Sequence, residues 1–212
     1  MGYLLRRRAF MTTPLDESWN YEWEYTAGLL ENNGWTKTTL GTTTSTMTSA
    51  GQRLTSSINS YVRLEHPSFA VVDVGVLEVV ASVVYASGGN NDTGRGSQNM
   101  RLSISNGENG IQVYVNGDTS SNSIGIGLKL MDNNDPRLGT FLAPFESGSE
   151  HTIRLELNHN TGAVWLDRVL IRDNIDTSTI LYCPASRIWS QNQVGNGSET
   201  IIKSVKIRKN RL

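Results

Sequence analysis

The sequence predicts an all-β protein built as a two-sheet antiparallel sandwich. Three observations lead to this prediction. Apolar and polar residues alternate with a period of two along many short runs, as they do in strands that bury one face. Turns rich in Asn, Gly, Ser and Asp separate these runs. Only 18% of the 212 residues are charged and Lys is scarce, which disfavours long helices. The length suits one large β domain with a short extra segment.

A short N-terminal arm, residues 1 to 18, is predicted to precede a sandwich formed by residues 19 to 212. The arm has no sustained period. It carries a basic cluster of three arginines: Arg6, Arg7 and Arg8. We interpret this cluster either as a solvated terminus or as an anchor that docks on an acidic partner. Neither a signal peptide nor a transmembrane helix is expected, because no apolar run approaches the necessary ~18 residues.

Residues 19 to 25 alternate cleanly and predict the first strand. Its aromatic residues share one face: Trp19, Tyr21, Trp23 and Tyr25. Such a stripe either caps the sandwich core or forms an exposed surface that docks on another subunit. On the second interpretation, Trp19 and Trp23 are the contacts for oligomerisation. Residues 35 to 64 are rich in Thr, a β-branched residue, and predict two or three exposed strands.

Clearer strands follow from residue 74. Inward and outward positions alternate through residues 77 to 84, and a second hairpin joins residues 100 to 104 to residues 111 to 115 across an Asn-Gly-rich turn. Another strand is predicted at residues 124 to 130, and the last at residues 199 to 208. The whole pattern amounts to roughly ten to thirteen short strands.

The most regular hairpin lies at residues 151 to 171. Its first strand alternates apolar Ile153, Leu155 and Leu157 with polar residues on the other face. A turn at residues 158 to 162 leads into a return strand. In that strand Val164 and Leu166 face the core and Trp165 faces away.

The order of these strands resembles that of the concanavalin A-like lectin and glucanase superfamily, including its laminin-G-like members. The resemblance is carried by Val76-Leu-Glu-Val-Val-Ala-Ser-Val-Val, by the hairpin with Ile111-Gln-Val-Tyr-Val, and by His151-Thr-Ile-Arg-Leu-Glu-Leu with Ala163-Val-Trp-Leu-Asp. Asn33-Gly-Trp35 and the closing Ile202-Lys-Ser-Val-Lys-Ile fit its first and last segments. The resemblance implies that the sandwich is a concanavalin A-like jelly roll. Lectins, glycosidases and structural modules share this fold, so the fold does not choose a function.

The sequence argues against an enzyme. A retaining glucanase needs two carboxylates about 5 Å apart, and the resemblance implies a Glu-x-Asp-x-x-Glu strand to supply them. Here Glu78 is followed by Val80 and Ser82 at the partner positions. No nucleophile elbow is present, and the three histidines have no zinc-binding spacing.

A sugar site is predicted from outward-facing residues, on the condition that their strands are neighbours. The set combines an aromatic platform with hydrogen-bonding groups: Trp165, Tyr114, Gln112, Arg101, Arg154 and Glu156. The alternative is a solvated face, or one covered by another subunit. Trp189, which we place on a loop, is a second candidate platform.

No cofactor is expected. The resemblance implies Ca²⁺ as a candidate ligand of Asp- and Asn-rich loops, and here the candidate residues are Asp92, Asp132 and Asp135. The same residues are common in ordinary turns. A net charge of −1 gives no overall field to hold nucleic acid or an anionic membrane.

The basic arm, the absence of a signal peptide and the Asn-, Thr- and Ser-rich strands are typical of a bacteriophage virion component. We therefore predict a non-enzymatic virion structural protein, such as a capsid-decoration, fibre or tail component, assembled in the host cytoplasm. Its partners would be other virion proteins and further copies of itself, and its lectin-like domain would attach to host or environmental glycans. The alternative is a carbohydrate-binding module or lectin of a bacterial protein.

Overall fold

In a computed structural model, the described residues are 19–57, 59–67, 74–84, 97–105, 110–117, 123–129, 143–158, 161–177, 185–192 and 198–210. Within these ranges lie fifteen strands and two short 3-10 helices, η1 (Tyr25–Ala27) and η2 (Leu30–Asn32). None of the described helices is long and apolar enough to cross a membrane. The predicted arm, with Arg6, Arg7 and Arg8, lies outside the described residues.

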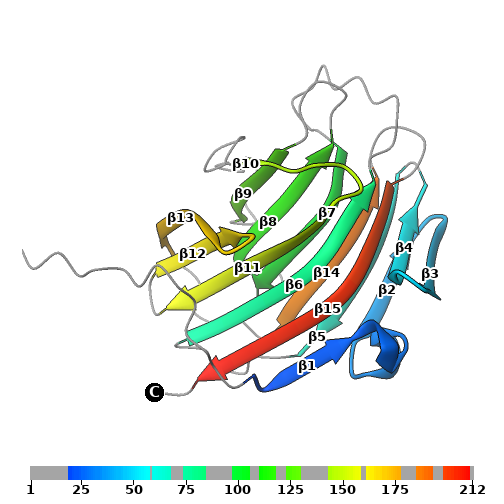
Figure 1. Ribbon diagram of the computed structural model, residues 1–212, viewed down its shortest axis with the longest axis horizontal. Coiled ribbons are helices and arrows are strands. Elements are labelled where there is room, and N and C mark those ends of the chain that lie inside the picture. Colours follow the sequence, from blue (N-terminus) through cyan, green and yellow to red (C-terminus); the bar gives the residue numbers. More distant parts are fainter. Residues whose placement is uncertain are drawn as a thin grey trace, which may run out of the picture.

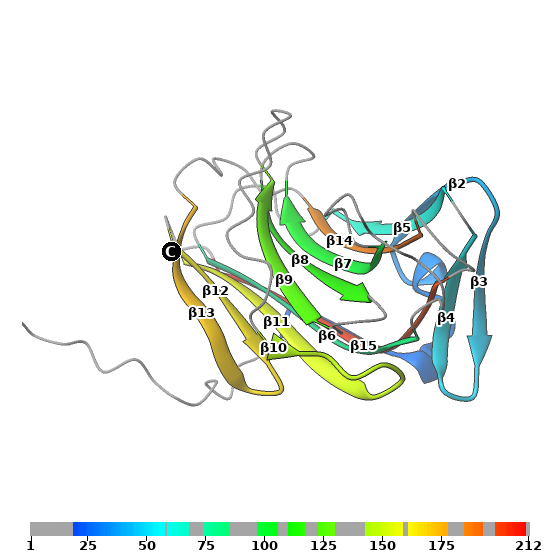
Figure 2. The same cartoon turned by 90° about the horizontal axis from the view of Figure 1, so that it is seen from above.

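The strands form two antiparallel sheets. Sheet A contains, in spatial order, β13 (Val169–Asp176), β12 (Thr161–Leu166), β11 (Glu150–Asn158), β6 (Val74–Val84), β15 (Ser198–Asn210), β4 (Gly51–Ser56) and β3 (Thr43–Thr48), with β1 (Tyr21–Glu24) also pairing with β15. Sheet B contains β10 (Ala143–Pro144), β9 (Ser123–Lys129), β8 (Gly110–Gly117), β7 (Ser97–Ser105), β14 (Ala185–Asn192), β5 (Ser60–His66) and β2 (Thr36–Leu40). Figure 1 shows sheet A in front. Figure 2 shows that sheet A wraps around sheet B and that both curve in the same direction. The predicted two-sheet sandwich is confirmed.

The core lies between the sheets and follows the predicted alternation. Every second residue of β6 is fully buried: Leu77, Val79, Ala81 and Val83. Sheet B contributes the facing residues Leu102, Ile104, Ile111 and Val113, each at most 1% exposed. Burying each of the larger side chains stabilises the fold by about 1.5–3 kcal/mol. Glu78 lies between the buried residues Leu77 and Val79 of β6, so its side chain faces away from the core.

The predicted hairpin at residues 151 to 171 forms, but it ends earlier than expected. β11 and β12 pair from Ile153–Leu166 to Asn158–Thr161. Asp167 and Arg168 then have positive φ values of 51° and 67° and turn the chain into β13. Positive φ at both central positions is the requirement of a type I′ hairpin turn, and without Gly such a turn gives no strong sequence signal. The return strand of the hairpin was predicted to run to residue 171. This is wrong, because the turn at Asp167 and Arg168 ends that strand at Leu166.

Three residues of the aromatic stripe, Tyr21, Trp23 and Tyr25, pack in or against the core. Trp23 is 2% exposed, and its indole nitrogen donates to the Gly28 carbonyl at 2.9 Å. The Tyr21 hydroxyl accepts from the Trp35 indole nitrogen at 3.0 Å and donates to the Asn33 carbonyl at 3.0 Å. A role for Trp23 in docking another subunit is therefore wrong, because its side chain is not accessible.

One edge of β15 is shared by two strands. β4 pairs with residues 198 to 202, and β1 pairs with residues 204 to 207. Along the other edge, the register with β6 shifts between Ile202 and Ser204. Gly51 begins β4 beside this changeover with a φ of 141°. A Cβ on Gly51 would lie 2.5 Å from the Ile202 carbonyl oxygen, so only glycine fits.

We expect Gly51→Ala to destabilise the protein by about 3 kcal/mol, because it combines a forbidden φ with a backbone clash. Gly148→Ala is the matched control. Gly148 also has a positive φ, 79°, but a Cβ there would meet nothing within 4 Å, so its cost is about 1 kcal/mol. Urea unfolding measures both. Equal losses would show that the close approach to Ile202 is unimportant.

A buried polar network joins η2 to the β3–β4 hairpin. Gln52 is 0% exposed, and its amide oxygen accepts from the Leu30 backbone N–H at 2.8 Å. Its amide nitrogen donates to Glu31 Oε2 at 2.6 Å and to Ser45 Oγ at 2.9 Å. Ser45 Oγ donates to Glu31 Oε1 at 2.7 Å, and Lys37 Nζ lies 3.2 Å from the same oxygen. Burial by itself raises the pKa of Glu31, but these donors, led by Ser45, outweigh it, so the pKa of Glu31 is lowered.

A lowered folded-state pKa means that Glu31 stabilises the protein above the ordinary glutamate pKa. This contribution is lost as the pH falls through the lowered pKa. We therefore expect Glu31→Gln to be less stable than the wild type at pH 7, with the difference shrinking on acidification. Chemical unfolding across pH 7 to 3 measures it. Glu24→Gln, at an exposed position of β1, is the control and should change stability by less than about 0.5 kcal/mol. A difference independent of pH would contradict this account.

Candidate functional site

The six residues predicted to form one sugar site are divided between the two sheets. Arg154, Glu156 and Trp165 lie on β11 and β12, on the outer face of sheet A. Arg101 and Gln112 lie on the outer face of sheet B, where Tyr114 holds a position in β8 but its side chain lies outside the described part. The outer faces point away from each other (Figure 2). The prediction that these residues form a single groove is therefore wrong. Alternation with a period of two indicates that a side chain faces outward, but it does not indicate to which sheet the strand belongs.

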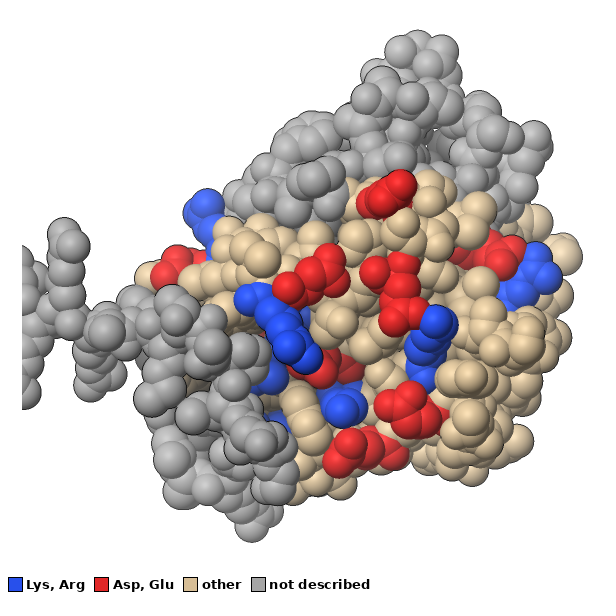
Figure 3. Space-filling model, in the orientation of Figure 1, with Lys and Arg blue, Asp and Glu red and all other residues tan. Residues whose placement is uncertain are grey.

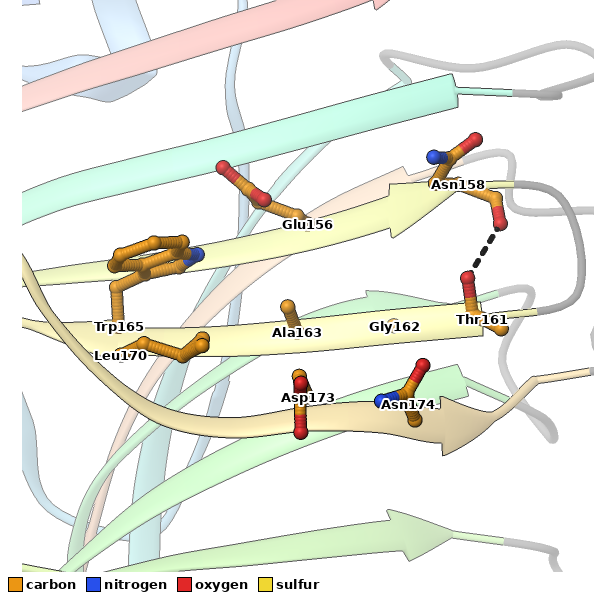
Figure 4. A pocket seen from close by; sticks show the side chains of 9 residues that line it. All are labelled: Glu156, Asn158, Thr161, Gly162, Ala163, Trp165, Leu170, Asp173 and Asn174. Atoms are coloured by element: carbon orange, nitrogen blue, oxygen red, sulfur yellow. Dashed lines mark hydrogen bonds between the residues drawn. The ribbon is translucent and has the colours of Figure 1, made fainter. Parts of the chain in front are cut away.

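The sheet A group lines a cleft near the edge of the sheet, with a volume of about 160 Å³. Figure 4 shows the residues that line it, contributed by three adjacent strands: Glu156, Asn158, Thr161, Gly162, Ala163, Trp165, Leu170, Asp173 and Asn174. At one end the Thr161 hydroxyl donates to the Asn158 carbonyl at 3.0 Å. At the other end lie Trp165 and Leu170, so the cleft has an apolar end and a polar end.

Two irregularities in β13 bring Asp173 and Asn174 to this cleft. The register with β12 shifts between Gly162 and Val164, and again between Val164 and Trp165. Each shift leaves an extra residue in β13, as in a β-bulge. Asn174 adopts a positive φ of 51°, which Asn tolerates better than most residues. Bulges re-aim side chains, and here Asp173 lines the cleft alongside Ala163. Neither residue was predicted from the sequence to belong to a site.

The cleft combines the groups that hold a small hydroxylated ring. The electron-rich face of an indole packs against weakly positive C–H groups. The carboxylates of Glu156 and Asp173 accept hydrogen bonds from hydroxyls, while amides such as that of Asn158 both donate and accept. The Trp165 indole nitrogen is buried, has no hydrogen-bond partner among the described residues, and lies on the side of the ring nearer the other labelled residues (Figure 4).

A row of charges of alternating sign crosses the outer face of sheet A beside the cleft. Starting from Trp165 in the cleft, the cross-strand partners that follow in register are Arg154, Glu78, Lys206 and Glu22. Arg154 is 5% exposed, with its Nε 2.6 Å from Glu156 Oε1 and its Nη1 3.5 Å from Glu78 Oε2. Figure 3 shows the two signs interspersed on this face. The charges are thus largely paired within the sheet.

Trp19 covers part of this row. Its ring centroid is 5.6 Å from Arg154 Cζ and 5.9 Å from Lys206 Nζ, distances typical of cation–π contacts. Trp19 therefore lies on the outer face of sheet A, whereas Trp23 is in the core. The prediction that both share one face of the first strand is wrong, because Trp19 precedes the strand and does not follow its alternation.

Sheet B presents a different outer face. Trp189 lies in β14, with Arg63 on one side and Arg101 on the other. The Arg101 Cζ is 5.3 Å from the Trp189 ring centroid. In the next row, Arg187 pairs with Glu65, with 2.6 Å between Nε and Oε2. The prediction that Trp189 occupies a loop is wrong.

Several outward residues of sheet B are nevertheless buried. Ser103, Gln112 and Arg187 are 2%, 6% and 7% exposed, although they alternate with core residues along their strands. In Figure 2 this face lies on the inside of the sheet's curve. Curvature brings neighbouring side chains together, which favours a recessed polar surface over a flat solvated one.

Metal binding was predicted only for loop residues. Asp92, Asp132 and Asp135 all lie outside the described residues. In the part of the chain that the structure describes, no group of three or more His, Cys, Asp or Glu residues is arranged to hold a metal ion. The Ca²⁺ hypothesis thus stays a prediction about those loops.

Comparison with known proteins identifies the fold. No family model and no curated protein sequence matches the chain. Solved structures do match. The metal-free carbohydrate recognition domain of Emp46p has a TM-score of 0.63 at 16% identity, covering 92% of this chain and 100% of that domain. The Crh5 transglycosylase in complex with NAG has a TM-score of 0.65 at 13% identity, covering 90% and 84%.

A third match is the carbohydrate esterase vb_24B_21 from the Shiga toxin-encoding bacteriophage phi24B. Its TM-score is 0.60 at 13% identity, and the match covers 92% of this chain and 99% of the other. The fold is concanavalin A-like. The resemblance stated from the sequence is thereby confirmed at the level of fold. At such identities a concanavalin A-like sandwich does not by itself define an activity.

The concanavalin A-like sandwich thus carries two candidate surfaces on opposite sides. We call the first the Trp165 cleft, defined by the nine lining residues given above. We call the second the sheet B face, defined by Arg63, Arg101, Gln112, Arg187 and Trp189 with their neighbours Glu65 and Ser103. One is an aromatic cleft with carboxylates and amides, and the other is an aromatic surface rich in arginine.

Proposed function

We propose that the protein is a carbohydrate-binding domain and that the Trp165 cleft holds a sugar residue. The observation that carries this proposal is the composition of the cleft. An indole whose N–H has no partner among the described residues lies beside two carboxylates and two amides in one small hollow. Small-molecule sites combine apolar surface with a few placed polar groups in this way. Two structural matches support this proposal: the Emp46p domain is a carbohydrate recognition domain, and Crh5 is a transglycosylase in complex with NAG.

The size of the cleft limits the ligand. A volume of about 160 Å³ is below the ~300–1,000 Å³ typical of drug-sized ligands. It therefore suits one sugar residue, with the rest of a glycan extending over the edge of sheet A. So small a contact gives weak binding, on the order of millimolar for one site, or about −4 kcal/mol. Useful affinity would then come from several copies acting together.

We propose further that the domain does not catalyse a reaction. Glu156 lines the cleft and Glu78 lies on the neighbouring strand, and both contact the guanidinium of Arg154. A glycosidase needs one carboxyl that is protonated and free to donate. Neither of these carboxyls is free, because the Arg154 guanidinium contacts each of them. The solved relatives include a transglycosylase and a carbohydrate esterase, so this proposal rests on the residues of this chain.

Replacing the indole tests the sugar site. We expect the wild type to bind neutral sugars on a glycan array. For the strongest neutral hit, Trp165→Ala should weaken binding by at least about tenfold in isothermal titration calorimetry, which is about 1.4 kcal/mol. Val169→Ala is the control, because Val169 is 64% exposed on the same hairpin and does not line the cleft.

An array without neutral hits, or a Trp165→Ala variant with full affinity, would contradict this assignment. Reducing-end analysis of the bound glycan tests the absence of catalysis. Cleavage that Glu78→Gln abolishes would contradict the non-catalytic part alone.

We also propose that the domain is a virion component, displayed outward and anchored by residues 1 to 18. The basic cluster in that segment supports an anchor, and a bacteriophage protein among the structural matches supports the setting. Trp19 is the first described residue, and it packs on Arg154 and Lys206. The described chain thus begins on the outer face of sheet A.

Deleting residues 1 to 18 tests the anchor. We expect native mass spectrometry to detect an oligomer for the full chain and a monomer for the deletion variant. The thermal midpoint of the monomer should fall by no more than a few degrees, since the deleted segment precedes the core strands. A monomeric full chain, or an oligomer that survives deletion, would contradict anchoring. Mass spectrometry of purified phage particles that carry the gene tests the virion setting itself.

A further inference from the structure

The Trp165 cleft contains a carboxylate that pairs with no cation among the described residues. Asp173 is half-buried in β13 and lines the cleft alongside Ala163 of β12 (Figure 4). Within the described part of the chain, no hydrogen bond or ion pair joins the Asp173 side chain to another group. Glu156, the other carboxylate of the cleft, has its Oε1 2.6 Å from Arg154 Nε. Asp173 is therefore the carboxylate that is open to a cation brought by a ligand.

The indole of the cleft also differs from the other tryptophans on the outer faces of the two sheets. Arg154 Cζ lies 5.6 Å from the ring centroid of Trp19, and Arg101 Cζ lies 5.3 Å from that of Trp189. Among the described residues, no lysine or arginine lies over the ring of Trp165 in this way. The aromatic face of the cleft is thus the one that can accept a cation from outside.

The contacts of Arg154 explain why its side chain does not fill this position. Arg154 is the cross-strand partner of Trp165 on β11. Its guanidinium contacts Glu156 and Glu78, and it lies over the ring of Trp19. Three groups other than Trp165 therefore hold it. An aromatic ring attracts a cation within about 6 Å of its centroid, so the position beside Trp165 remains available to a ligand.

The floor of the cleft separates its two carboxylates by one small residue. Ala163 pairs in register with Glu156 of β11 on one side, and Asp173 of β13 lies on its other side. Neighbouring strands are about 4.8 Å apart, so the space above Ala163 lies between the two carboxylates. Trp165 lies two residues along β12, about 7 Å away on the same face. A small cation above Ala163 would face both carboxylates and the edge of the indole's reach.

The cleft also calls for a hydrogen-bond acceptor. Trp165 Nε1 is buried and has no partner among the described residues. An indole N–H only donates, and an ammonium group only donates, so a bare ammonium ion would leave the indole N–H unpaired. A hydroxyl accepts as well as donates. A ligand that satisfies the whole cleft therefore carries both a positive charge and hydroxyl groups.

We propose that the Trp165 cleft prefers a positively charged amino sugar, whose ammonium group lies above Ala163. The ammonium donates to Asp173 and to the second oxygen of Glu156, and a sugar hydroxyl accepts from the indole N–H of Trp165. This inference rests on the proposed function, because it names the class of sugar that the same cleft selects. A neutral sugar still fits the cleft but binds more weakly, since it leaves Asp173 without a cation.

A matched pair of trisaccharides tests the preference by isothermal titration calorimetry. One is the trimer of glucosamine, and the other is its fully N-acetylated, neutral form. At about pH 6, where the free amine is protonated, we expect the amine to bind about tenfold tighter, as a charge-assisted hydrogen bond would produce. This advantage should shrink as salt rises and vanish above about pH 9, where the amine is neutral.

Asp173→Asn locates the ammonium group. The amide keeps the shape of the side chain and removes its charge, so the two trisaccharides should then bind within about threefold of each other, with neutral binding unchanged. Glu24→Gln is the matched control, because it removes a charge from an exposed position of β1 in the same sheet, outside the cleft. It should keep the tenfold preference. Circular dichroism confirms that both variants fold, and the pH dependence of the wild type tests the proposal independently of them.

Several results would overturn the inference, and they separate it from the proposed function. Equal wild-type affinity for the two trisaccharides, with both lost in Trp165→Ala, would remove the amine preference and leave the sugar site standing. Binding of no sugar at all would remove both. A full preference in Asp173→Asn would place the ammonium elsewhere. Choline bound as tightly as the glucosamine trimer would assign the cleft to small ammonium compounds instead of sugars.

Discussion

The fold depends on how β15 shares its edge between two strands. β15 runs through the middle of sheet A, pairing with β6 along one side and with β4 and then β1 along the other. This arrangement brings a strand near each end of the described chain into one sheet, and it places Trp23 in the core opposite Val205. The changeover requires the backbone of Gly51 to approach Ile202 closely. The network of Glu31 and Gln52 then secures the segment that follows β1.

Much of the fold could be predicted from the sequence because alternation is a local property. The inward residues of β6 and the β11–β12 hairpin follow from a period of two. β14 was missed because its core-facing positions include Ser186 and Ser190, both 0% exposed, so no apolar alternation marks it. The turn at Asp167 and Arg168 was missed because it achieves positive φ without glycine.

The candidate site could be predicted only in part, since sheet order is not local. Trp165 and Arg101 both face outward as expected, yet β12 and β7 belong to different sheets. Neither Asp173 in the cleft nor the arginines around Trp189 form a motif in sequence. They meet because bulges shift β13 and because β14 inserts between β5 and β7. One sandwich can thereby offer two faces of different chemistry: an aromatic cleft with carboxylates and amides on one, and arginines around Trp189 on the other.

The bulges of β13 also matter for solubility. β13 is an edge strand of sheet A, and edge strands with free backbone groups and apolar side chains recruit other chains into aggregates. Val169 and Leu170 on this edge are 64% and 36% exposed. The two register shifts and the left-handed Asn174 distort the line of N–H and C=O groups that an incoming strand would need. The irregularity that shapes the cleft thus also hinders another chain from pairing with this edge.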